Sequence, residues 1–230
     1  MLANDPLAQV LYIDLSRRSF AIKQRPDLFE AGLGGSGAGI RLLEEECAAG
    51  TDPLAPGSPI ILAVGPLSGL YPLASKTVAM FKSPHTGNLG ESHAGGRSAI
   101  AIRMAGYGAI VVRGASVSPV YVVVDGNHVH FRDASALWGT RSAYTAGSVL
   151  REREKGSGAR SILRIGRAGE MGVTYAAVIS ETYRHFGRLG LGAVFGSKKL
   201  KGLVISGQRS LPVADRKAYR AAYDGLYKAA

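Results

Sequence analysis

The chain has 230 residues, 46% of them hydrophobic and 20% charged, a composition that suits a globular protein with a sizeable core and excludes intrinsic disorder. The formal net charge of +11 would attract polyanions such as nucleic acids, phosphorylated cofactors or acidic proteins. The single cysteine, Cys47, excludes an internal disulfide and an iron–sulfur cluster held by four thiolates of this chain.

The first half of the chain predicts short strands that alternate with glycine-rich turns. Val10–Leu15 and Ser19–Ile22 indicate a hairpin. The glycine-rich segment Gly32–Gly39 leads into a helix expected over about Ala38–Ala48, with Cys47 packed on its buried face. The other elements expected in this half are the strands Ile60–Val64, Thr77–Phe81 and Ala109–Val112 and the short helix Ser98–Ala105, which ends at Gly106.

The second half opens with the clearest hairpin of the sequence. Val120–Val124 and His128–Phe131 are joined through the turn residues Asp125, Gly126 and Asn127. The elements expected after it are a polar helix over about Ser142–Glu154, strands at Ser161–Ile165, Tyr175–Ile179 and Leu203–Ile205, a helix that starts near Gly187–Gly192, and a C-terminal helix capped by Asp215.

Two segments share one pattern. His93–Gly114 and Gly187–Gly207 each contain a glycine-rich start, a short helix, a glycine, an apolar strand and a closing glycine, and they are offset by about 93 positions. This similarity predicts an internal duplication. We therefore expect an α+β fold in which two similar mixed β-sheets with short helices are related by a pseudo-two-fold axis.

Glycine-rich segments are the candidate ligand sites. Gly34–Gly39 lacks a preceding strand and a following β-α-β pattern, which disfavours a dinucleotide site and leaves close backbone packing or another ligand role open. His93 stands before a glycine pair that would permit close approach of a ligand. Arg184 and Arg188 flank a glycine-rich helix start, a pattern typical of anion sites, with a solvated basic loop as the alternative.

Chemistry by the chain's own side chains is not indicated. The five histidines are scattered, and neither H-E-x-x-H nor Cys-x-x-Cys nor G-x-S-x-G occurs. No apolar run reaches the roughly 18 residues of a membrane helix, and Met1–Leu15 is typical of an approach to a strand rather than of a signal peptide. We expect a cytoplasmic protein that binds a ligand, without a membrane span and without a catalytic residue of its own.

Several motifs together resemble one enzyme family, the tungsten-containing aldehyde:ferredoxin oxidoreductases, in their N-terminal domain. The resemblance covers about residues 7–215. The motifs, which follow the family's order, are Asp52-Pro-Leu-Ala-Pro56, Gly65-Pro-Leu-Ser-Gly69, Lys82-Ser-Pro-His-Thr-Gly87, Ala105-Gly-Tyr107, Leu137-Trp-Gly139, Ile165-Gly-Arg-Ala-Gly-Glu170, Arg184-His-Phe-Gly-Arg188 and Gly192-Ala-Val-Phe-Gly-Ser-Lys-Lys-Leu-Lys201.

The resemblance implies a cofactor-binding part of an oxidoreductase that acts on aldehydes or oxo groups and uses ferredoxin as electron acceptor. Residues 1–212 would bind a tungsten (or molybdenum) bis-pterin and magnesium, and residues 213–230 would form a helix that leads to the missing domains. A [4Fe-4S] cluster would belong to a larger partner chain. The implied cofactor-binding residues are Lys76, His93, Ala94, Gly95, Gly96, Arg184, His185, Gly187 and Arg188, with the backbone carbonyls of His93 and His185 near the magnesium.

Three of these positions depart from the family pattern. Lys76 stands where the family has an arginine, His93 where it has an asparagine, and His185 where it has a small residue. A lysine retains the charge but not the planar fork of a guanidinium. The departures leave open a second interpretation, a non-catalytic relic or binding module of the same fold. A nucleic-acid binder, the third alternative, rests on net charge alone and has no aromatic-interleaved basic motif to support it.

Overall fold

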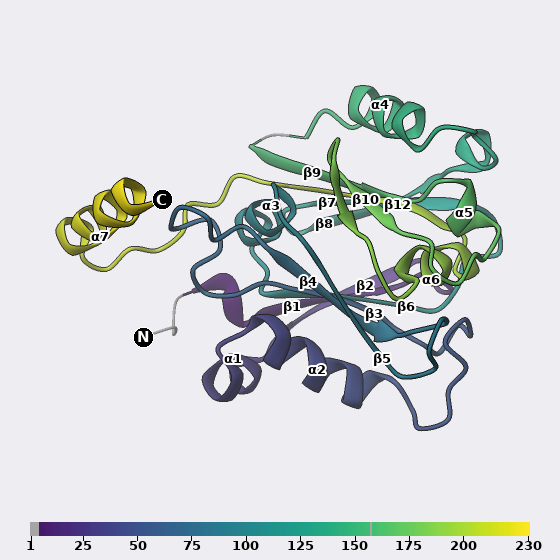
Figure 1. Cartoon of the computed structure of the whole chain (residues 1–230), viewed down its shortest axis with the longest axis horizontal. Helices are drawn as coiled ribbons and strands as arrows, with labels where there is room; N and C mark the ends of the chain where they lie inside the picture. Colours follow the sequence, from purple (N-terminus) through teal and green to yellow (C-terminus); the bar gives the residue numbers. More distant parts are fainter. Residues whose placement is uncertain (1–4, 157) are drawn as a thin grey trace.

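The computed structural model describes residues 5–156 and 158–230, and this part of the chain contains two six-stranded mixed sheets (Figure 1). The strand order is β2-β1-β6-β3-β4-β5 in the first sheet and β11-β10-β9-β12-β7-β8 in the second. The strands of the first sheet are β1 (Gln9–Asp14), β2 (Ser19–Gln24), β3 (Ile60–Ala63), β4 (Thr77–Lys82), β5 (Leu89–Ala94) and β6 (Ala109–Arg113). Those of the second are β7 (Val120–Asp125), β8 (His128–Asp133), β9 (Ala159–Arg164), β10 (Val178–Ser180), β11 (Arg184–Phe186) and β12 (Leu200–Gly207).

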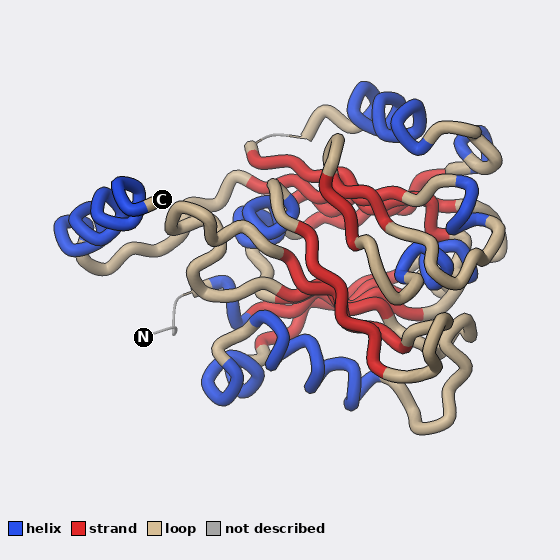
Figure 2. Tube along the Cα trace, in the orientation of Figure 1, coloured by secondary structure: helices blue, strands red, loops and turns tan. Residues whose placement is uncertain are grey.

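Short helices connect and cover these strands, as the blue segments of Figure 2 show. The α-helices are α1 (Pro26–Gly32), α2 (Gly35–Glu46), α3 (Ser98–Ala105), α4 (Ala143–Arg153), α5 (Arg167–Glu170), α6 (Leu191–Ser197) and α7 (Arg216–Ala229), and two 3-10 turns lie at Pro6–Ala8 and Ser135–Leu137. None of the helices in the described residues is long and apolar enough to cross a membrane.

The two halves of the chain repeat one topology, which confirms the predicted duplication. Written from the hairpin edge inward, the second sheet has the order β8-β7-β12-β9-β10-β11, which matches the first sheet strand for strand. In each half the first strand pairs in parallel with the last one, β1 with β6 and β7 with β12. The helices correspond as well, since α2 and α4 precede the third strand and α3 and α6 precede the last strand of their halves.

A single hydrophobic core lies between the two sheets. Figure 1 shows α1 and α2 below the first sheet, α4 above the second, and α3 and α6 between the two. On β7, Val122 and Val124 face this central core, whereas Tyr121 and Val123 pack toward α4 with Leu150. Both faces of this strand are therefore buried, which explains why its sequence is a continuous apolar run.

Most predicted elements are confirmed, and α3 has the predicted bounds. Helix α2 begins three residues before its predicted start, because Gly34 at φ +79° already turns the chain into the helix. The expected burial of Cys47 is wrong, since this residue ends the helix and is only half-buried. The α-helices and strands that the sequence did not predict are α1, α5, β5 and β11.

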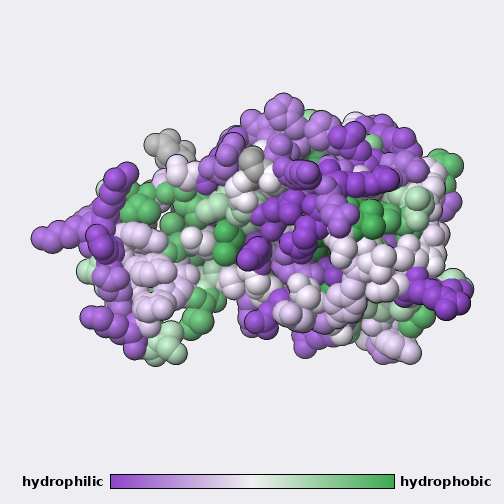
Figure 3. Space-filling view, turned by 90° about the horizontal axis from the view of Figure 1, so that it is seen from above, coloured by the Kyte–Doolittle hydropathy of each residue, from purple (hydrophilic) through white to green (hydrophobic). Residues whose placement is uncertain are grey.

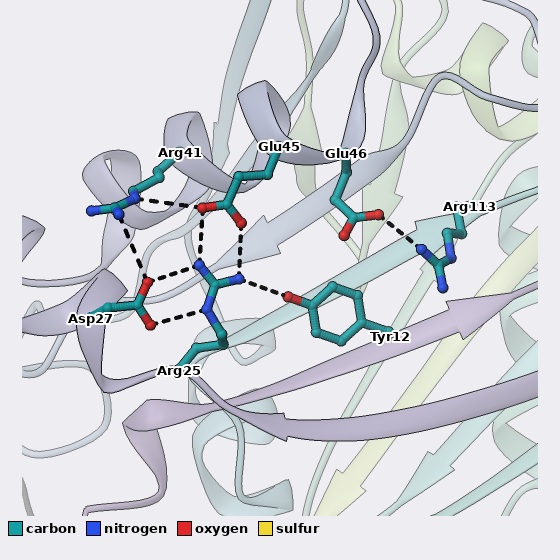
Figure 4. A network of polar contacts seen from close by, with 7 residues as sticks. All are labelled: Tyr12, Arg25, Asp27, Arg41, Glu45, Glu46 and Arg113. Carbon is teal, nitrogen blue, oxygen red and sulfur yellow. Dashed lines mark hydrogen bonds and ion pairs between the residues drawn. The ribbon is translucent and has the colours of Figure 1, made fainter.

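Arg25 connects α1, α2 and β1 (Figure 4). Its guanidinium donates to Asp27 at 3.0 and 2.8 Å, to Glu45 at 2.9 and 3.0 Å, and to the Tyr12 hydroxyl at 3.2 Å. Hydrogen bonds to Asp27 and Glu45 raise the pKa of Arg25, so the charge persists at any accessible pH. This network fixes the C-terminal end of α2 against the first sheet.

Lys198 ties the second half to the first. It follows α6, its side chain is fully buried, and its Nζ donates to the carbonyl oxygens of Pro56 at 3.1 Å and Gly114 at 3.0 Å. Burial lowers the pKa of the Lys198 ammonium to about 8. The ammonium therefore releases its proton more readily in the folded than in the unfolded chain.

This pKa shift predicts a pH dependence of stability. Between pH 8 and the ordinary lysine pKa of about 10.4, the unfolded chain binds more protons at this position, so the free energy of unfolding rises with pH. From pH 7 to pH 10, the free energy of unfolding of the native chain should rise by about 2 kcal/mol relative to that of Lys198→Met. Urea unfolding of both proteins at pH 7, 8.5 and 10 measures it, and buried tyrosines cancel in the difference. A constant difference would show that Lys198 keeps its ordinary pKa.

Candidate functional site

The edge strands β5 and β11 of the two sheets lie side by side, so the site predicted from both halves forms where the halves meet. Arg188 Nε donates to the Glu91 carbonyl oxygen at 3.0 Å. A β-carbon added to Gly96 would lie 3.3 Å from Arg184 Cγ. The structure thus brings residues before α3 together with the two arginines before α6.

Glu91 organises the side chains of this edge. Its Oε1 accepts a hydrogen bond from Ser36 Oγ at 2.8 Å and lies 2.8 Å from His93 Nε2. The bond from Ser36, and then the one from His93, lowers the pKa of the Glu91 carboxyl. The carboxylate therefore fixes the orientation of the His93 ring against the first turn of α2.

A pocket of ≈ 440 Å³ opens beside His93. Its polar lining comes from Ser36, Ser68, Ser75, Lys76 and His93, and the remainder comes mainly from the loop between β3 and β4. The leucines of this pocket are exposed, with Leu73 at 84% and Leu33 at 70%. A lining that is both cationic and apolar suits an anionic ligand with an apolar part.

Three glycines around this edge leave space above the backbone. A β-carbon added to Gly35, Gly65 or Gly95 would meet no other heavy atom within 4 Å. Packing within the described residues therefore does not require glycine at Gly65 or Gly95, neither of which has a positive φ. Open space above a glycine permits close approach of a ligand to the backbone, so these positions fit a bound group.

The predicted residues divide into those that converge and those that do not. His93, Gly96, Arg184 and Arg188 lie at the shared edge, and Lys76 reaches the same pocket as His93. Gly95 is half-buried and directly precedes Gly96 at this edge. The others are Ala94, buried where β5 pairs with Thr77; His185, exposed on β11 opposite Ile179; and Gly187, exposed beside His185. Within the described residues His185 makes no polar contact with the rest of the site.

Sequence reasoning missed Glu91 and Ser36. Glu91 stands two positions before His93 on β5, so the strand period places both side chains on one face. That signal was available only if β5 had been recognised as a strand. In the described part of the chain, no three His, Cys, Asp or Glu side chains gather as metal ligands, so a metal here would need ligands from a cofactor or from the backbone.

Sequence comparison places these features in a known group. The family model described as "Aldehyde ferredoxin oxidoreductase, N-terminal domain" matches residues 10–207. The tungsten-containing aldehyde ferredoxin oxidoreductase of Thermococcus kodakarensis is 39% identical over 194 residues, 84% of this chain and 32% of the relative. The aliphatic sulfonate oxidoreductase, WOR-like subunit, of Pyrococcus furiosus is 31% identical over 218 residues, 89% of this chain and 35% of the relative.

Structure comparison agrees with the sequence. The active site complex BamBC of benzoyl coenzyme A reductase, solved with 1,5 dienoyl-CoA, superposes with a TM-score of 0.86 at 30% identity, over 96% of this chain and 34% of that chain. The chain thus spans about a third of the length of the curated relatives and of the solved structure that it matches.

Proposed function

Because this chain belongs to the family of aldehyde ferredoxin oxidoreductase N-terminal domains, we propose that it forms one wall of a tungsten bis-pterin site and works together with a larger, cluster-bearing polypeptide. The observation that carries the proposal is the convergence of both halves on one edge, with Lys76, His93, Arg184 and Arg188 around open glycines. Residues 1–212 would form this cofactor-binding domain.

The chain's residues would bind and orient the cofactor. The side chains of Arg184 and Arg188 would neutralise its phosphates, and the exposed Lys76 would pair with a further anionic group beside the pocket. The backbone at Gly95 and Gly96 would lie against the cofactor, near the carbonyl oxygens of His93 and His185 that are proposed to face magnesium. When bound, the metal and its pterins would supply two-electron oxidation and reduction.

A cluster-bearing polypeptide would complement the described residues. Within the described residues Cys47 is the free thiol, and no cysteine cluster exists to hold a [4Fe-4S] centre. Helix α7 stands apart from the sheets (Figure 1), with Leu226 and Tyr227 exposed. We propose that α7 leads to the missing domains, that these carry the cluster and pass electrons to ferredoxin, and that the assembly acts on an aldehyde or oxo group in the cytoplasm.

Gly95 offers a test that separates cofactor binding from folding. Gly95→Leu should keep the free energy of unfolding of the chain within about 0.5 kcal/mol, because its side chain would enter open space. The same substitution should lower the tungsten content of the anaerobically purified assembly by about tenfold or more, because the leucine would occupy the position of the cofactor. Elemental analysis for tungsten, molybdenum, magnesium and iron measures this content.

Gly57→Leu is the control, since Gly57 is exposed, an added β-carbon there would meet only Thr51 Cγ2 at 3.9 Å, and the position lies outside the site. It should leave the metal content unchanged. If native preparations contain neither tungsten nor molybdenum nor a pterin, and no larger chain co-purifies, the proposal fails. The departures at Lys76, His93 and His185 would then favour the second candidate, a binding module that has lost the cofactor.

A further inference from the structure

A separate pocket, of ≈ 100 Å³, lies between α4, β9 and the turn that follows β10. Two arginines, Arg151 and Arg164, line it together with the hydroxyl-bearing side chains Tyr144, Ser148 and Thr182. These are the donor groups that recognise an oxyanion. None of them belongs to the edge where β5 meets β11.

Arg164 is the buried member of this group, with 2% of its surface exposed. Its Nε donates to the Ala143 carbonyl oxygen at 2.9 Å, and its Nη1 donates to the Glu181 carbonyl oxygen. Within the described residues, Nη2 meets no acceptor and the guanidinium forms no ion pair with a carboxylate. Burial lowers the pKa of Arg164, and the charge of the nearby Glu181 carboxylate offsets this effect only in part.

The internal duplication shows what packing alone requires at this position. Arg164 pairs with Gly202 on β12, and Ala63 pairs with Ala109 on β6. Gly202 and Ala109 are equivalent under the offset of about 93 positions, so Ala63 is the first-half counterpart of Arg164. The glycine of α2 that faces Ala63 is Gly39, and the glycine of α4 that faces Arg164 is Gly147.

The first half therefore builds the same helix–sheet contact from an alanine and Met80, without a charge. The second half buries a guanidinium there, flat against Gly147, whose added β-carbon would lie 2.7 Å from Arg164 Nε. The first half thus shows that this helix–sheet contact does not require an arginine, and burying a charge opposes folding unless partners compensate it. A bound anion would be such a partner.

The charges around the pocket are compatible with a bound anion. Glu181 lines it too, and its Oε2 lies 3.7 Å from Arg151 Nη2 while its Oε1 accepts a hydrogen bond from the Ile162 amide at 3.2 Å. One carboxylate against two guanidinium groups leaves a net positive charge. The surrounding face of the molecule, which α4 covers, is mostly hydrophilic (Figure 3). The lining residues Ser148, Arg151 and Thr182 are exposed, so a dissolved ion can reach the pocket.

From this arrangement we infer that the pocket beneath α4 is a binding site for a tetrahedral oxyanion of the phosphate type, with Arg164 as its fixed donor and Arg151 as its rim donor. The volume corresponds to about three water molecules, which suits a single phosphate group and excludes a nucleoside. Either free phosphate or the terminal phosphate of a larger ligand would supply this group.

Thermal unfolding of the full chain tests the inference. Inorganic phosphate should raise the melting temperature saturably, by about 5–10 °C at a concentration one hundred times its Kd, relative to sodium chloride of equal ionic strength. Glycerol 3-phosphate distinguishes the sources: binding equal to that of phosphate indicates the free ion, and tighter binding indicates a phosphate ester. Arg164→Met should abolish the phosphate response.

Arg151→Ala and Arg153→Ala form the matched pair, because both remove one exposed positive charge from α4 but only Arg151 lines the pocket. Arg151→Ala should weaken phosphate binding by about tenfold, and Arg153→Ala should leave it unchanged. Comparison of these two variants tests phosphate binding in the pocket even if Arg164→Met fails to fold. The inference is overturned if phosphate acts no differently from chloride, or if both alanine variants lose the response equally.

Discussion

Replacing Gly196 by alanine should destabilise the chain by about 3 kcal/mol or more, the effect of forcing atoms into a closely packed core. A β-carbon at this position would lie 1.9 Å from the Gly169 carbonyl oxygen, which belongs to the backbone of α5 and cannot rotate away. Helix α6 contacts α5 through glycines on both sides, since an added β-carbon at Gly169 of α5 would in turn lie 2.7 Å from the Gly192 carbonyl oxygen of α6.

Gly225→Ala is the control for Gly196→Ala. Gly225 lies inside the exposed helix α7, and a β-carbon there would meet nothing within 4 Å. Alanine has the higher helix propensity, so this substitution should be neutral or stabilise the chain by up to about 1 kcal/mol. Chemical denaturation of both variants measures the contrast. Equal stability of Gly196→Ala and Gly225→Ala would mean that α5 and α6 lie farther apart than the structure shows.

The same glycines explain how the fold could be recognised from sequence. The pattern of glycine, short helix, glycine and apolar strand in His93–Gly114 and Gly187–Gly207 marks a structural unit because several of its glycines stand where backbones touch. At Gly207, for example, an added β-carbon would lie 2.1 Å from the Ala105 amide nitrogen. Such positions tolerate no other residue, so they carry strong information about tertiary structure in a single sequence.

The strands β5 and β11 carried no comparable local signal. Leu89–Ala94 contains a glycine, a glutamate and a histidine, and Arg184–Phe186 is three residues long, two of them exposed. Each is a sheet edge that gains its strand conformation from pairing with a neighbour, and the conformation therefore depends on tertiary contacts more than on propensity. The candidate site is built around these two strands, which is why residue spacing alone did not bring its members together and only the family resemblance grouped them.

The individual residues of the site also differ in whether sequence alone could single them out. Arg184 and Arg188 were recognisable because paired arginines beside glycines indicate an anion site whatever the fold. Glu91 gains its role only from the position of Ser36, 55 residues earlier in the chain, at the start of a helix whose first turn was expected to be a loop. A contact between such distant segments has no signature in the spacing of either one.

Breaking the ion pair of Lys201 and Glu170 by one substitution should destabilise the chain by about 3–5 kcal/mol. Both side chains are buried, with 0% and 2% exposure, and Lys201 Nζ donates to Glu170 Oε1. Glu170 Oε2 also accepts a hydrogen bond from the Gly139 amide at 2.8 Å, so the pair joins β12, α5 and the loop before α4. Lys201→Met would leave a buried carboxylate without its counter-ion, and Glu170→Gln would leave a buried ammonium in the same state.

The double variant Glu170→Gln, Lys201→Met tests whether the loss of stability in the single variants comes from an unpaired buried charge. It should recover much of the loss seen in Lys201→Met, because no buried charge remains and the glutamine amide oxygen can still accept from Gly139. Arg113→Met is the exposed comparison: its pair with Glu46 at 3.0 Å is largely solvated and should contribute at most about 1 kcal/mol. Urea unfolding of the four variants gives the coupling energy between Glu170 and Lys201. If the losses of the two single variants simply add in the double variant, the two charges do not depend on each other, and the loop before α4 is held by the Glu170–Gly139 hydrogen bond alone.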